Sequence, residues 1–452
     1  MKKNKLFGTD GIRGKVGAIP LTENMVFELG KAVGEYLQGK GKVIIGKDTR
    51  YSCDRLEDVF ARGLYRGGIK VYSAGIIPTP GLAFLTKEMQ MNMGAMISAS
   101  HNLAEDNGIK FFYQDGFKIS DEAEEKIEEI IFKNMQDQEN VTKSSPDCVH
   151  YLTREEAELN YIEFLKNTVN HLDFHGIKLV IDCANGAAYH VAKRLFTELG
   201  LDTIIIHGEP NGKNINLNCG SLHPQHVAES VVYEKADLGF CFDGDADRLI
   251  IADEHGTILD GDYIMAMCAI DMHQKKTLTK HTLVTTVMSN FGLEKVMNER
   301  GINLLRTNVG DKYVISEMLK GGYTIGGEQS GHIIFLDYAT TGDGLITALQ
   351  VLKLFKESNR RLSEFSKCIV KYPQILLNIK VKQRVPLEEL PEVQERINEV
   401  VRQLKDEGRV VVRYSGTEPL LRIMLEGKSE EKINKLANAI AETVKQNIGL
   451  KR

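Results

Sequence analysis

The sequence predicts an α/β protein with three related α/β domains, each built on a mixed sheet, and a smaller C-terminal α+β domain. Two observations support this prediction. Short apolar runs alternate with helical patterns through most of the chain, and such alternation is typical of parallel or mixed sheets covered by helices. The chain also has 452 residues, more than one ordinary hydrophobic core holds, so two to four domains are expected.

The predicted strands fall into three similar sets. In the first set, the apolar run 42–48 leads to a helical pattern at 54–66 and then to apolar runs at 69–75 and 94–100. The second set has apolar runs at 177–183, 202–208 and 237–243. The third set has them at 281–289, 302–308 and 323–328. The last part of the chain instead has the pattern strand, helix, strand, strand, helix, which predicts the α+β domain.

Less regular segments separate these sets. The polar stretch 136–147 is the best candidate for a linker, and further joints are expected near 253–260 and 357–373. The predicted domains are therefore 1–150, 151–254, 255–368 and 369–452.

The composition indicates a soluble globular protein that binds neither nucleic acid nor a membrane. Hydrophobic residues make up 42% and charged residues 26% of the chain, which is usual for such proteins. The net charge is −5, and the basic residues are dispersed rather than gathered in one stripe. Isolated basic residues such as Lys47, Arg50 and Lys312 are interpreted as surface charges. No run of 18 apolar residues predicts a membrane span, and the start has no signal peptide pattern.

The cysteines carry no recognisable spacing. Seven are dispersed along the chain without a CxxC pair. This favours reduced thiols in a cytoplasmic protein over disulfides or a zinc site.

Three alternating aspartates form the most informative motif. Asp243, Asp245 and Asp247 occur in the run DGDADR, which Arg248 closes, and apolar runs precede and follow it. Strand-like alternation would place the three carboxylates on one side. Carboxylates so close together repel one another, so a divalent cation with oxygen ligands is expected between them, namely Mg²⁺, Mn²⁺ or Ca²⁺.

Other interpretations of this aspartate loop are weighed against the metal site. An EF-hand would place Asp243 at position 1 and Glu254 at position 12, but Arg248 stands where the EF-hand needs glycine, and the flanks resemble strands. A solvated turn explains Gly244 but not three acids beside an arginine. A phosphatase of the haloacid-dehalogenase type, with Asp243 as the nucleophile, stays open from these residues alone.

A second motif centres on a serine. The run 95–112 predicts a buried strand that ends at Ser100, a polar loop, and a strand that resumes at 109–112. A serine at a strand end beside a cation can carry a phosphoryl group in transit, whereas a lone serine is more often a cap. A hydrolase dyad of Ser100 with His101 is disfavoured, because neighbours on a strand face opposite ways.

The glycine-rich run GGEQSGH at 326–332 predicts a sugar-binding loop. Glu328 and Ser330 can hydrogen-bond neighbouring hydroxyls of a sugar. His332 could shuttle a proton at neutral pH or be a structural histidine.

The run RYSGTEP at 413–419 predicts a phosphate-binding loop. Arg413, Ser415, Gly416 and Thr417 can surround a phosphate with a guanidinium, two hydroxyls and backbone N–H groups. Arg422 could assist them or form a surface ion pair.

Taken together and in order, ISASHN, NGIK, DGDADR, GGEQSGH and RYSGTEP resemble the α-D-phosphohexomutase superfamily. The runs FGTDGIRG, DCANGAAY (182–189) and NINLNCGSLHP (214–224) are similar to its bacterial branch that acts on glucosamine phosphates. The chain departs from the family at Leu103, where proline is usual. Leucine adds a backbone N–H and frees one torsion, so we expect a less rigid serine loop with its catalytic groups intact.

The resemblance implies a reaction and a place for each motif. The domains would surround a central cleft, and the chain would interconvert glucosamine 6-phosphate and glucosamine 1-phosphate in UDP-N-acetylglucosamine biosynthesis, which supplies cell-wall precursors. A phosphoserine at Ser100 would transfer its phosphoryl group through a glucosamine 1,6-bisphosphate intermediate, and this bisphosphate or glucose 1,6-bisphosphate would act as activator. Mutases of mannose or glucose phosphates are the nearest alternative, ahead of the phosphatase.

The resemblance also implies roles for single residues. Mg²⁺ would be held by the three aspartates and by a phosphate oxygen on Ser100. Lys110 and His332 would transfer protons or neutralise charge, and Arg13 and Arg248 would offset charge on the phosphoryl group. Glu328 and Ser330 would bind the 3- and 4-hydroxyls, and the loop from Arg413, with Arg422, would hold the other phosphate. The expected partner is a small phosphosugar, and a homodimer is among the assemblies considered.

Overall fold

The computed structural model describes residues 5–8, 10–135, 149–415 and 419–450. The described residues fall into two compact units. The first comprises Met1–Thr286 and Leu305–Ser366, and the second comprises Val287–Leu304 and Lys367–Arg452.

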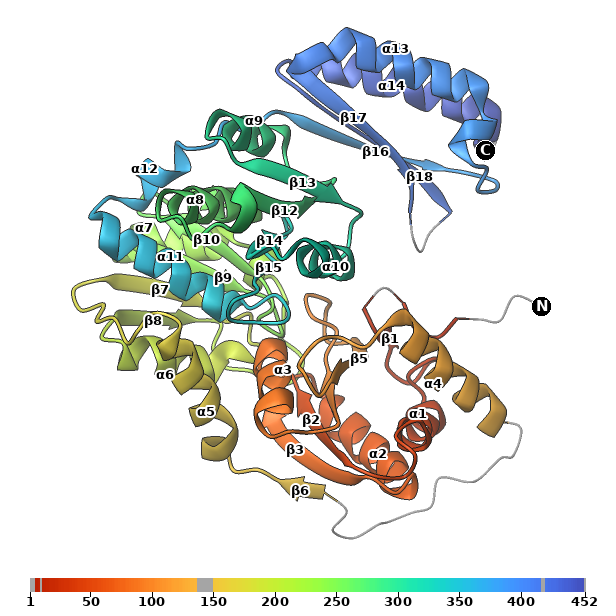
Figure 1. The fold of residues 1–452 in the computed structure, drawn as a ribbon, viewed down its shortest axis with the longest axis vertical. Coiled ribbons are helices and arrows are strands. Elements are labelled where there is room, and N and C mark those ends of the chain that lie inside the picture. The colour runs from red at the N-terminus through yellow and green to blue at the C-terminus, as the bar shows by residue number, and fades with distance from the viewer. Residues whose placement is uncertain (1–4, 9, 136–148, 416–418, 451–452) are drawn as a thin grey trace. The chain divides into compact units, whose positions relative to one another are not determined.

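The first sheet of the first unit is mixed (Figure 1). Its strand order is β1-β5-β4-β2-β3-β6. The strands are β1 (Ile12–Lys15), β2 (Lys42–Lys47), β3 (Lys70–Ile76), β4 (Met93–Ile97), β5 (Asp106–Tyr113) and β6 (Val149–Tyr151). The helices of this region are α1 (Glu23–Tyr36), α2 (Cys53–Arg66), α3 (Thr79–Glu88) and α4 (Asp121–Asn134). Strands β2, β3, β4 and β6 are parallel, whereas β5 is antiparallel to β4 and to β1.

Both faces of this sheet are buried, as neighbouring residues of β2 show. Successive side chains on a strand point to opposite faces. Val43 and Ile45 pack in the cluster that includes the apolar faces of α1, α2 and α4. Ile44, between them, packs instead with residues of α3 and with Ala157. A strand that is covered on both sides has a nearly continuous apolar sequence, as in KVIIG.

The second sheet has the order β11-β10-β9-β7-β8. Its strands are β7 (Lys178–Asp182), β8 (Asp202–Ile206), β9 (Leu238–Phe242), β10 (Leu249–Asp253) and β11 (Ile258–Leu259). Its helices are α6 (Ala188–Glu198), α7 (Gln225–Glu234) and the short 3₁₀ turn η1 (Gly220–Leu222). Strand β8 lies on one side of β7 and β9 on the other. The chain thus reverses its winding at the carboxyl ends of β7 and β9, which is where doubly wound sheets bind their ligands.

The third sheet has the order β13-β12-β14-β15. Its strands are β12 (Thr282–Thr286), β13 (Asn303–Thr307), β14 (Ile325–Gly327) and β15 (Ile333–Phe335). The helices that follow or precede them in the first unit are α8 (Gly261–Gln274), α10 (Asp311–Gly321), α11 (Gly344–Ser358) and α12 (Leu362–Ser366), with the 3₁₀ turn η2 (Thr279–His281). Val314 and Met318 of α10 pack on Val284 and Ile334 of the sheet.

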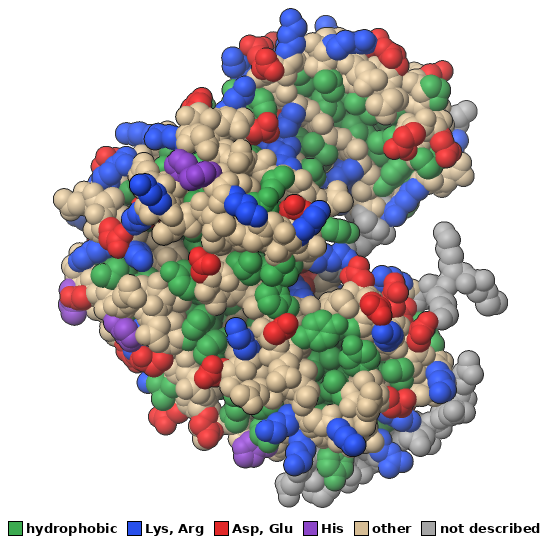
Figure 2. Space-filling view, viewed as in Figure 1, with side chains coloured by type: hydrophobic (Ala, Val, Ile, Leu, Met, Phe, Trp, Pro, Cys, Tyr) green, Lys and Arg blue, Asp and Glu red, His purple; other side chains and the backbone are tan. Residues whose placement is uncertain are grey.

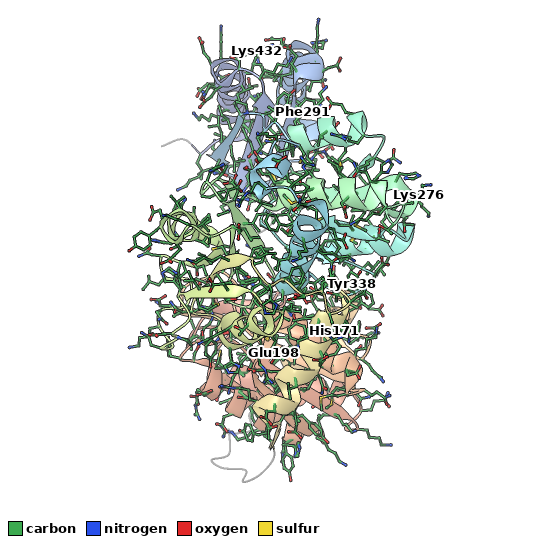
Figure 3. The ribbon with its side chains drawn as sticks, turned by 90° about the vertical axis from the view of Figure 1, so that its left-hand side faces the viewer. His171, Glu198, Lys276, Phe291, Tyr338 and Lys432 are labelled. Atoms are coloured by element: carbon green, nitrogen blue, oxygen red, sulfur yellow. The ribbon has the colours of Figure 1, made fainter. Side chains whose placement is uncertain are left out.

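Helix α5 (Arg154–Asn167) joins these layers within the first unit. Its Tyr161 is fully buried and donates a hydrogen bond to Asp343 Oδ2 at 2.8 Å. Asp343 in turn caps α11 by accepting from the backbone N–H of Leu345 and Ile346. On its other side, α5 meets α6 through Lys166, which pairs with Glu198, labelled in Figure 3.

The second unit contains an antiparallel sheet with the order β16-β18-β17. Its elements are α9 (Phe291–Glu299), β16 (Gln374–Lys380), α13 (Pro391–Leu404), β17 (Gly408–Tyr414), β18 (Leu420–Gly427) and α14 (Glu430–Ile448), with 3₁₀ turns at η3 (Leu387–Glu389) and η4 (Lys405–Glu407). Apolar side chains of α13 and α14 cover one face of the sheet. Asn290 joins α9 to the rest of the unit, because its side chain bonds both the backbone N–H and the carbonyl of Tyr372. The Tyr372 ring also meets Phe291 edge-on; Phe291 is labelled in Figure 3.

Acidic and basic side chains are interspersed on the face shown in Figure 2. Among the described residues, no helix is both long enough and apolar enough to span a membrane.

The predicted fold class is confirmed. Strands and helices alternate in mixed sheets, and the C-terminal part has the predicted order β16, α13, β17, β18, α14. The predicted linker at 136–147 lies outside the described residues. The four domain bounds and the central cleft stay predictions.

Glycines allow α1 and α2 to approach closely, and this contact generates a prediction about stability. A Cβ on Gly63 would lie 2.2 Å from the backbone oxygen of Phe27, and one on Gly30 would lie 2.3 Å from that of Phe60. We therefore expect Gly63→Ala to force the helices apart, with a cost of about 1–3 kcal/mol, as is typical of overpacking. The measurement is the apparent Tm by calorimetry. Glu129→Ala, at an exposed position of α4, should change the Tm little, and an unchanged Tm in Gly63→Ala would contradict the argument.

Candidate active site around the aspartate loop

The three aspartates converge in a turn rather than on a strand. Strand β9 ends at Phe242 and β10 begins at Leu249. Between them Ala246 has a φ of 57°, so the chain bends sharply. The prediction that strand alternation aligns the carboxylates was therefore wrong, although the carboxylates do come together. One oxygen from each lies within 4.8 Å of the others, and the antiparallel strands that flank the turn also exclude an EF-hand.

Burial and crowding separate the pKa values of these carboxylates. Burial raises the pKa of Asp243 well above its usual range, and the nearby Asp247 and Asp245 add to the rise. Burial also opposes ionisation of Asp247, but Lys110, His332 and Arg248 lower its pKa well below the usual range. The negative charge of the turn is therefore favoured on Asp247 and disfavoured on Asp243.

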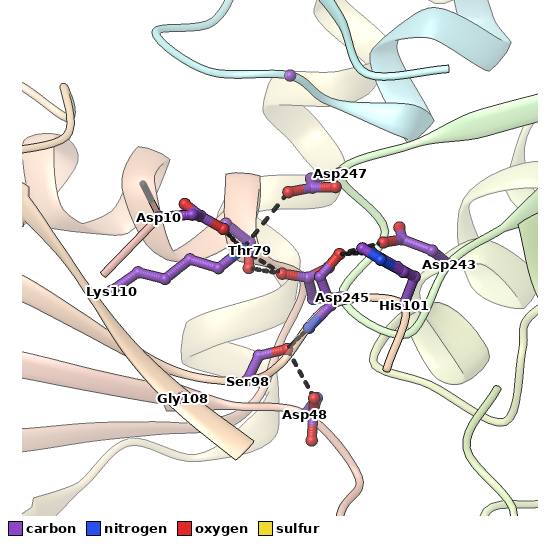
Figure 4. A network of polar contacts seen from close by, with 12 residues as sticks. Asp10, Asp48, Thr79, Ser98, His101, Gly108, Lys110, Asp243, Asp245 and Asp247 are labelled. Carbon is purple, nitrogen blue, oxygen red and sulfur yellow. Dashed lines mark hydrogen bonds and ion pairs between the residues drawn. The ribbon is translucent and has the colours of Figure 1, made fainter. Parts of the chain in front are cut away.

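Lys110 is the main counter-charge inside the site. It lies on β5 and is 1% exposed. Its ammonium lies 2.9 Å from Asp245 Oδ2, 3.2 Å from Asp10 Oδ2 and 3.5 Å from Asp247 Oδ2. Figure 4 labels Lys110 and these three carboxylates. Burial alone would lower the pKa of Lys110, but these carboxylates raise it well above the usual value. Lys110 is thus held in its charged form.

The aspartate loop has the donors that a divalent cation needs. In the described part of the chain, Asp245 Oδ1 and Asp247 Oδ1 are buried without a hydrogen-bond partner, which is costly unless an ion or a ligand supplies one. The donor set consists of oxygens, as hard cations prefer. The three aspartates can therefore hold a divalent metal ion.

Ser100 faces the aspartate loop. Its backbone has a φ of 50°, its side chain is buried, and its Oγ donates a hydrogen bond of 2.6 Å to Asp243 Oδ2. The same Oγ lies 3.4 Å from His101 Nδ1, so the reason given against a Ser100–His101 pair was wrong, because these residues lie in a turn and not on a strand. Burial, with Arg248 and Arg13, lowers the pKa of His101 to about 4, so its ring is neutral.

Arg50 holds the serine loop from behind. It was interpreted as a surface charge, but it is 3% exposed, and its Nε bonds Asp48 Oδ2 at 2.9 Å. Its terminal nitrogens donate to the carbonyl oxygens of Ser100, Asn102, Leu103 and Asp106. The motif GKDTR gives no sign of this burial. The carbonyl of Leu103, the residue that replaces the usual proline, is thus one of the four that Arg50 holds.

Close backbone contact joins the serine loop to the aspartate loop. Asn216 Nδ2 donates to Ser100 O at 2.8 Å and to Asn102 O at 2.9 Å. A Cβ on Gly244 would lie 2.6 Å from Ser100 O. Glycine at the second position of DGDADR is therefore a packing requirement of this site.

The sugar loop follows β14 and reaches the same site. Glu328 Oε1 accepts from Gly310 N at 3.0 Å, and Ser330 Oγ is buried with no hydrogen-bond partner within the ranges that the structure describes. The backbone N–H of Leu249, next to Arg248, donates to Gly331 O at 3.0 Å. The loop is therefore anchored to the end of the aspartate loop.

His332 contacts the aspartate loop directly. Its Nδ1 lies 3.5 Å from Asp247 Oδ1, and its Nε2 accepts from Gly342 N at 3.1 Å. Burial lowers the pKa of His332, but Asp247 more than offsets this effect and raises it.

Sequence reasoning missed the charges that surround Lys110. Asp10 accepts from Arg13 at 3.1 Å and from Lys118 at 2.6 Å, and Lys118 also pairs with Asp311. Burial would raise the pKa of Asp10, but Lys110, Lys118 and Arg13 lower it. Of these residues only Arg13 was expected at the site. Asp10 stands in the same run FGTDGIRG and could have been noticed there, whereas Lys118 and Asp311 carry no motif signal. These side chains, except Arg13, border a cavity of about 610 Å³ that Ser100 and the three aspartates do not line.

The phosphate loop lies in the second unit. Arg413 on β17 and Arg422 on β18 are direct cross-strand partners, and like charges in this position are unfavourable. Burial and Arg422 lower the pKa of Arg413, whose Nε is buried and has no hydrogen-bond partner among the described residues. Arg384, which was not predicted, donates to Ser415 O at 2.6 Å. Gly416 and Thr417 lie outside the described residues. The described arginines favour an anion at this hairpin.

Comparison with known proteins extends over nearly the whole chain. Four domain families of phosphoglucomutase/phosphomannomutase match: the alpha/beta/alpha domain I at 4–138, domain II at 159–256, domain III at 260–372 and the C-terminal domain at 376–443. A phosphoglucosamine mutase of Thermoanaerobacter sp. (strain X514) is 50% identical over 98% of this chain and 99% of its own length. A phosphoglucosamine mutase of Pelobacter propionicus is 48% identical over 99% and 100%.

Solved structures share the fold at lower identity. A phosphoglucomutase/phosphomannomutase family protein from Burkholderia thailandensis has a TM-score of 0.80 at 22% identity and covers both chains fully. A putative phosphomannomutase from Thermus thermophilus has a TM-score of 0.76 at 24% identity and covers 97% of this chain and 98% of its own. The predicted resemblance is confirmed, and the chain belongs to the phosphoglucomutase/phosphomannomutase family of α-D-phosphohexomutases.

Proposed function

We propose that the chain is a phosphoglucosamine mutase, an isomerase that interconverts glucosamine 6-phosphate and glucosamine 1-phosphate. Full-length relatives at about 50% identity that carry this name support the choice of sugar. The reaction type rests on one geometric observation, the 2.6 Å hydrogen bond from Ser100 Oγ to Asp243 Oδ2 inside the buried aspartate loop.

That hydrogen bond suits Ser100 to carry a phosphoryl group. Its Oγ already lies beside the carboxylates that can bind a cation, so a phosphate on Oγ would add a further oxygen ligand. Mg²⁺, when bound by Asp243, Asp245 and Asp247, would offset charge on the transferring group. Arg248, whose Nε lies 4.0 Å from Asp243 Oδ2, would add a fixed positive charge.

The two proton transfers are assigned to Lys110 and His332. In the first transfer, the Ser100 Oγ–P bond breaks and a new P–O bond forms to the free hydroxyl of the sugar phosphate. The hydroxyl proton passes to His332, and Oγ takes a proton from Lys110, whose carboxylate neighbours keep it charged. The second transfer, from the other end of the 1,6-bisphosphate, reverses each proton movement and restores phosphoserine. General acid–base assistance of this kind is worth about 10²- to 10⁴-fold.

The remaining loops are assigned to binding. Ser330 Oγ, which no described residue hydrogen-bonds, and the carboxylate of Glu328 are proposed to bind sugar hydroxyls. The paired Arg413 and Arg422, with Arg384, are proposed to hold the phosphate that is not transferred, because a dianion there relieves their mutual repulsion. Arg13 is held by Asp10, so it is proposed to neutralise charge near Ser100 rather than to bind the sugar.

The reaction itself is the first test in solution. The purified chain is incubated with glucosamine 6-phosphate, Mg²⁺ and a catalytic amount of glucose 1,6-bisphosphate, and phosphorus NMR measures the products. We expect glucosamine 1-phosphate without free phosphate, and a kcat/KM at least about 10-fold above those for glucose or mannose 6-phosphate, since one lost polar contact typically costs this much or more.

Ser100→Ala should reduce turnover by roughly 10³-fold or more, because it removes the nucleophile. Stoichiometric phosphate release would favour a phosphatase, and near-normal turnover in a folded Ser100→Ala protein would remove the phosphoserine from the mechanism.

A second prediction concerns the metal. Asp245→Asn should lower turnover by about 10²-fold and weaken activation by Mg²⁺, because an amide oxygen binds the ion more weakly than a carboxylate oxygen does. The substitution also removes one of the negative charges that Lys110 pairs with. Activity is titrated with Mg²⁺ after treatment with EDTA. Asp202→Asn, at an exposed position on β8, is the matched control. An unchanged Mg²⁺ dependence in Asp245→Asn would exclude this carboxylate as a ligand.

A third prediction concerns Arg50. Arg50→Lys should lower kcat by about 10- to 100-fold and leave KM within about twofold, because lysine cannot hold four carbonyl oxygens and Asp48 at once. A time course by intact mass spectrometry should show that Ser100 still becomes phosphorylated, at a lower rate than in the unmodified chain. Arg300→Lys, at an exposed position after α9, is the control. A variant with unchanged kcat would show that the loop holds its geometry without the guanidinium.

A further inference from the structure

We propose that Asp182, His207 and Cys219 form a second metal site, for a divalent ion that accepts nitrogen and sulfur ligands, such as Zn²⁺. One donor atom of each residue lies within 4.8 Å of the others. None of these residues belongs to the phosphoryl-transfer machinery proposed above. The spacing of the cysteines gave no sign of zinc, because the fold brings together donors that are far apart in the sequence.

The fold places these donors at one edge of the second sheet. Asp182 is the last residue of β7, and His207 follows β8, its parallel neighbour. Cys219 precedes the turn η1. The carboxyl ends of parallel strands are where α/β sheets present ligand-binding groups.

The Asp182 carboxylate is oriented for a ligand. It is fully buried, its Oδ1 accepts from Ala184 N at 2.8 Å, and its Oδ2 accepts from Gly220 N at 3.1 Å. Backbone donors of this kind fix the direction of metal-binding carboxylates. His207 Nδ1 lies 3.0 Å from the same Oδ2. A metal ion between these two atoms would take the place of the proton that they share.

The Cys219 thiol completes the set. It is buried, and its Sγ lies 3.9 Å from Asn214 O and 3.9 Å from Asn185 Nδ2. Ligands of tetrahedral zinc lie about 3.3–3.8 Å from one another, so a small contraction of the cluster gives the required spacing. Metal binding would release the thiol proton to solvent.

His207 connects the cluster with a cavity. It lines a cavity of about 950 Å³ together with Asn185 and Asn214, whose Nδ2 and O, respectively, lie 3.9 Å from Cys219 Sγ, whereas Asp182 and Cys219 do not line it. Zinc sites with three protein ligands take a water in the fourth position, and the His207 side of the cluster is where such a water would enter. Oxygen, nitrogen and sulfur donors together favour Zn²⁺ or Co²⁺ over Mg²⁺.

Cobalt provides the test, because a thiolate bound to Co²⁺ gives an intense charge-transfer band in the near ultraviolet. The reduced full-length chain is titrated with Co²⁺ in excess Mg²⁺, which keeps the aspartate loop supplied with its preferred ion. We expect a band that saturates at one equivalent and is lost when Zn²⁺ is added. The band should be absent in Cys219→Ser, and His207→Gln should weaken Co²⁺ binding at least 10-fold.

Two variants control for unspecific binding. Cys368→Ser removes a half-buried thiol of the second unit, and Asp202→Asn removes an exposed carboxylate on β8. Both should bind Co²⁺ as the unmodified chain does. Circular dichroism establishes that each variant is folded. The proposal is overturned if the unmodified chain shows no band, or if the band persists in folded Cys219→Ser.

Discussion

Three buried carboxylates on one turn repel one another, and the other residues of the site compensate for this repulsion. Two like charges about 4 Å apart cost about 4 kcal/mol even at an effective dielectric constant of 20. Asp243, Asp245 and Asp247 are nearly inaccessible to solvent, so water cannot relieve this cost. Lys110 is buried among them, and the pKa of Asp243 rises. A divalent cation would remove the remaining imbalance, so this turn is able to bind one.

The same constraint explains why loops far apart in the sequence meet at the turn. The carboxylates require positive charge and hydroxyl donors on several sides, and no single loop can supply them all. Ser100 comes from the end of the first sheet, Lys110 from its antiparallel strand, and His332 from the third sheet. Helix α5 and the Tyr161–Asp343 hydrogen bond connect these layers within one compact unit. The precision of the site therefore depends on packing well outside it.

The fold class and the clustering of the three aspartates were predictable because their signals are local. Alternating apolar runs and helical patterns indicate an α/β fold, and acids at close spacing lie near one another whatever the backbone between them does. That backbone was predicted wrongly, since the left-handed Ala246 leaves no mark in the sequence. Burial of a charge is equally invisible. Arg50 resembles a surface residue until the fold encloses it, and Asp182, His207 and Cys219 become neighbours only through strand order.

Because Arg50 binds four carbonyl oxygens of the serine loop, it orients the peptide groups of that loop. In a trans peptide unit the carbonyl and the N–H point opposite ways, so carbonyls that turn toward the guanidinium send the following N–H groups away from it. The loop thus presents the positive ends of several peptide dipoles on its far side, as a helix does at its N-terminus. Leu103 extends this polarity. Its N–H belongs to the peptide unit whose carbonyl, that of Asn102, is bound by Arg50, and a proline at this position would have no such donor.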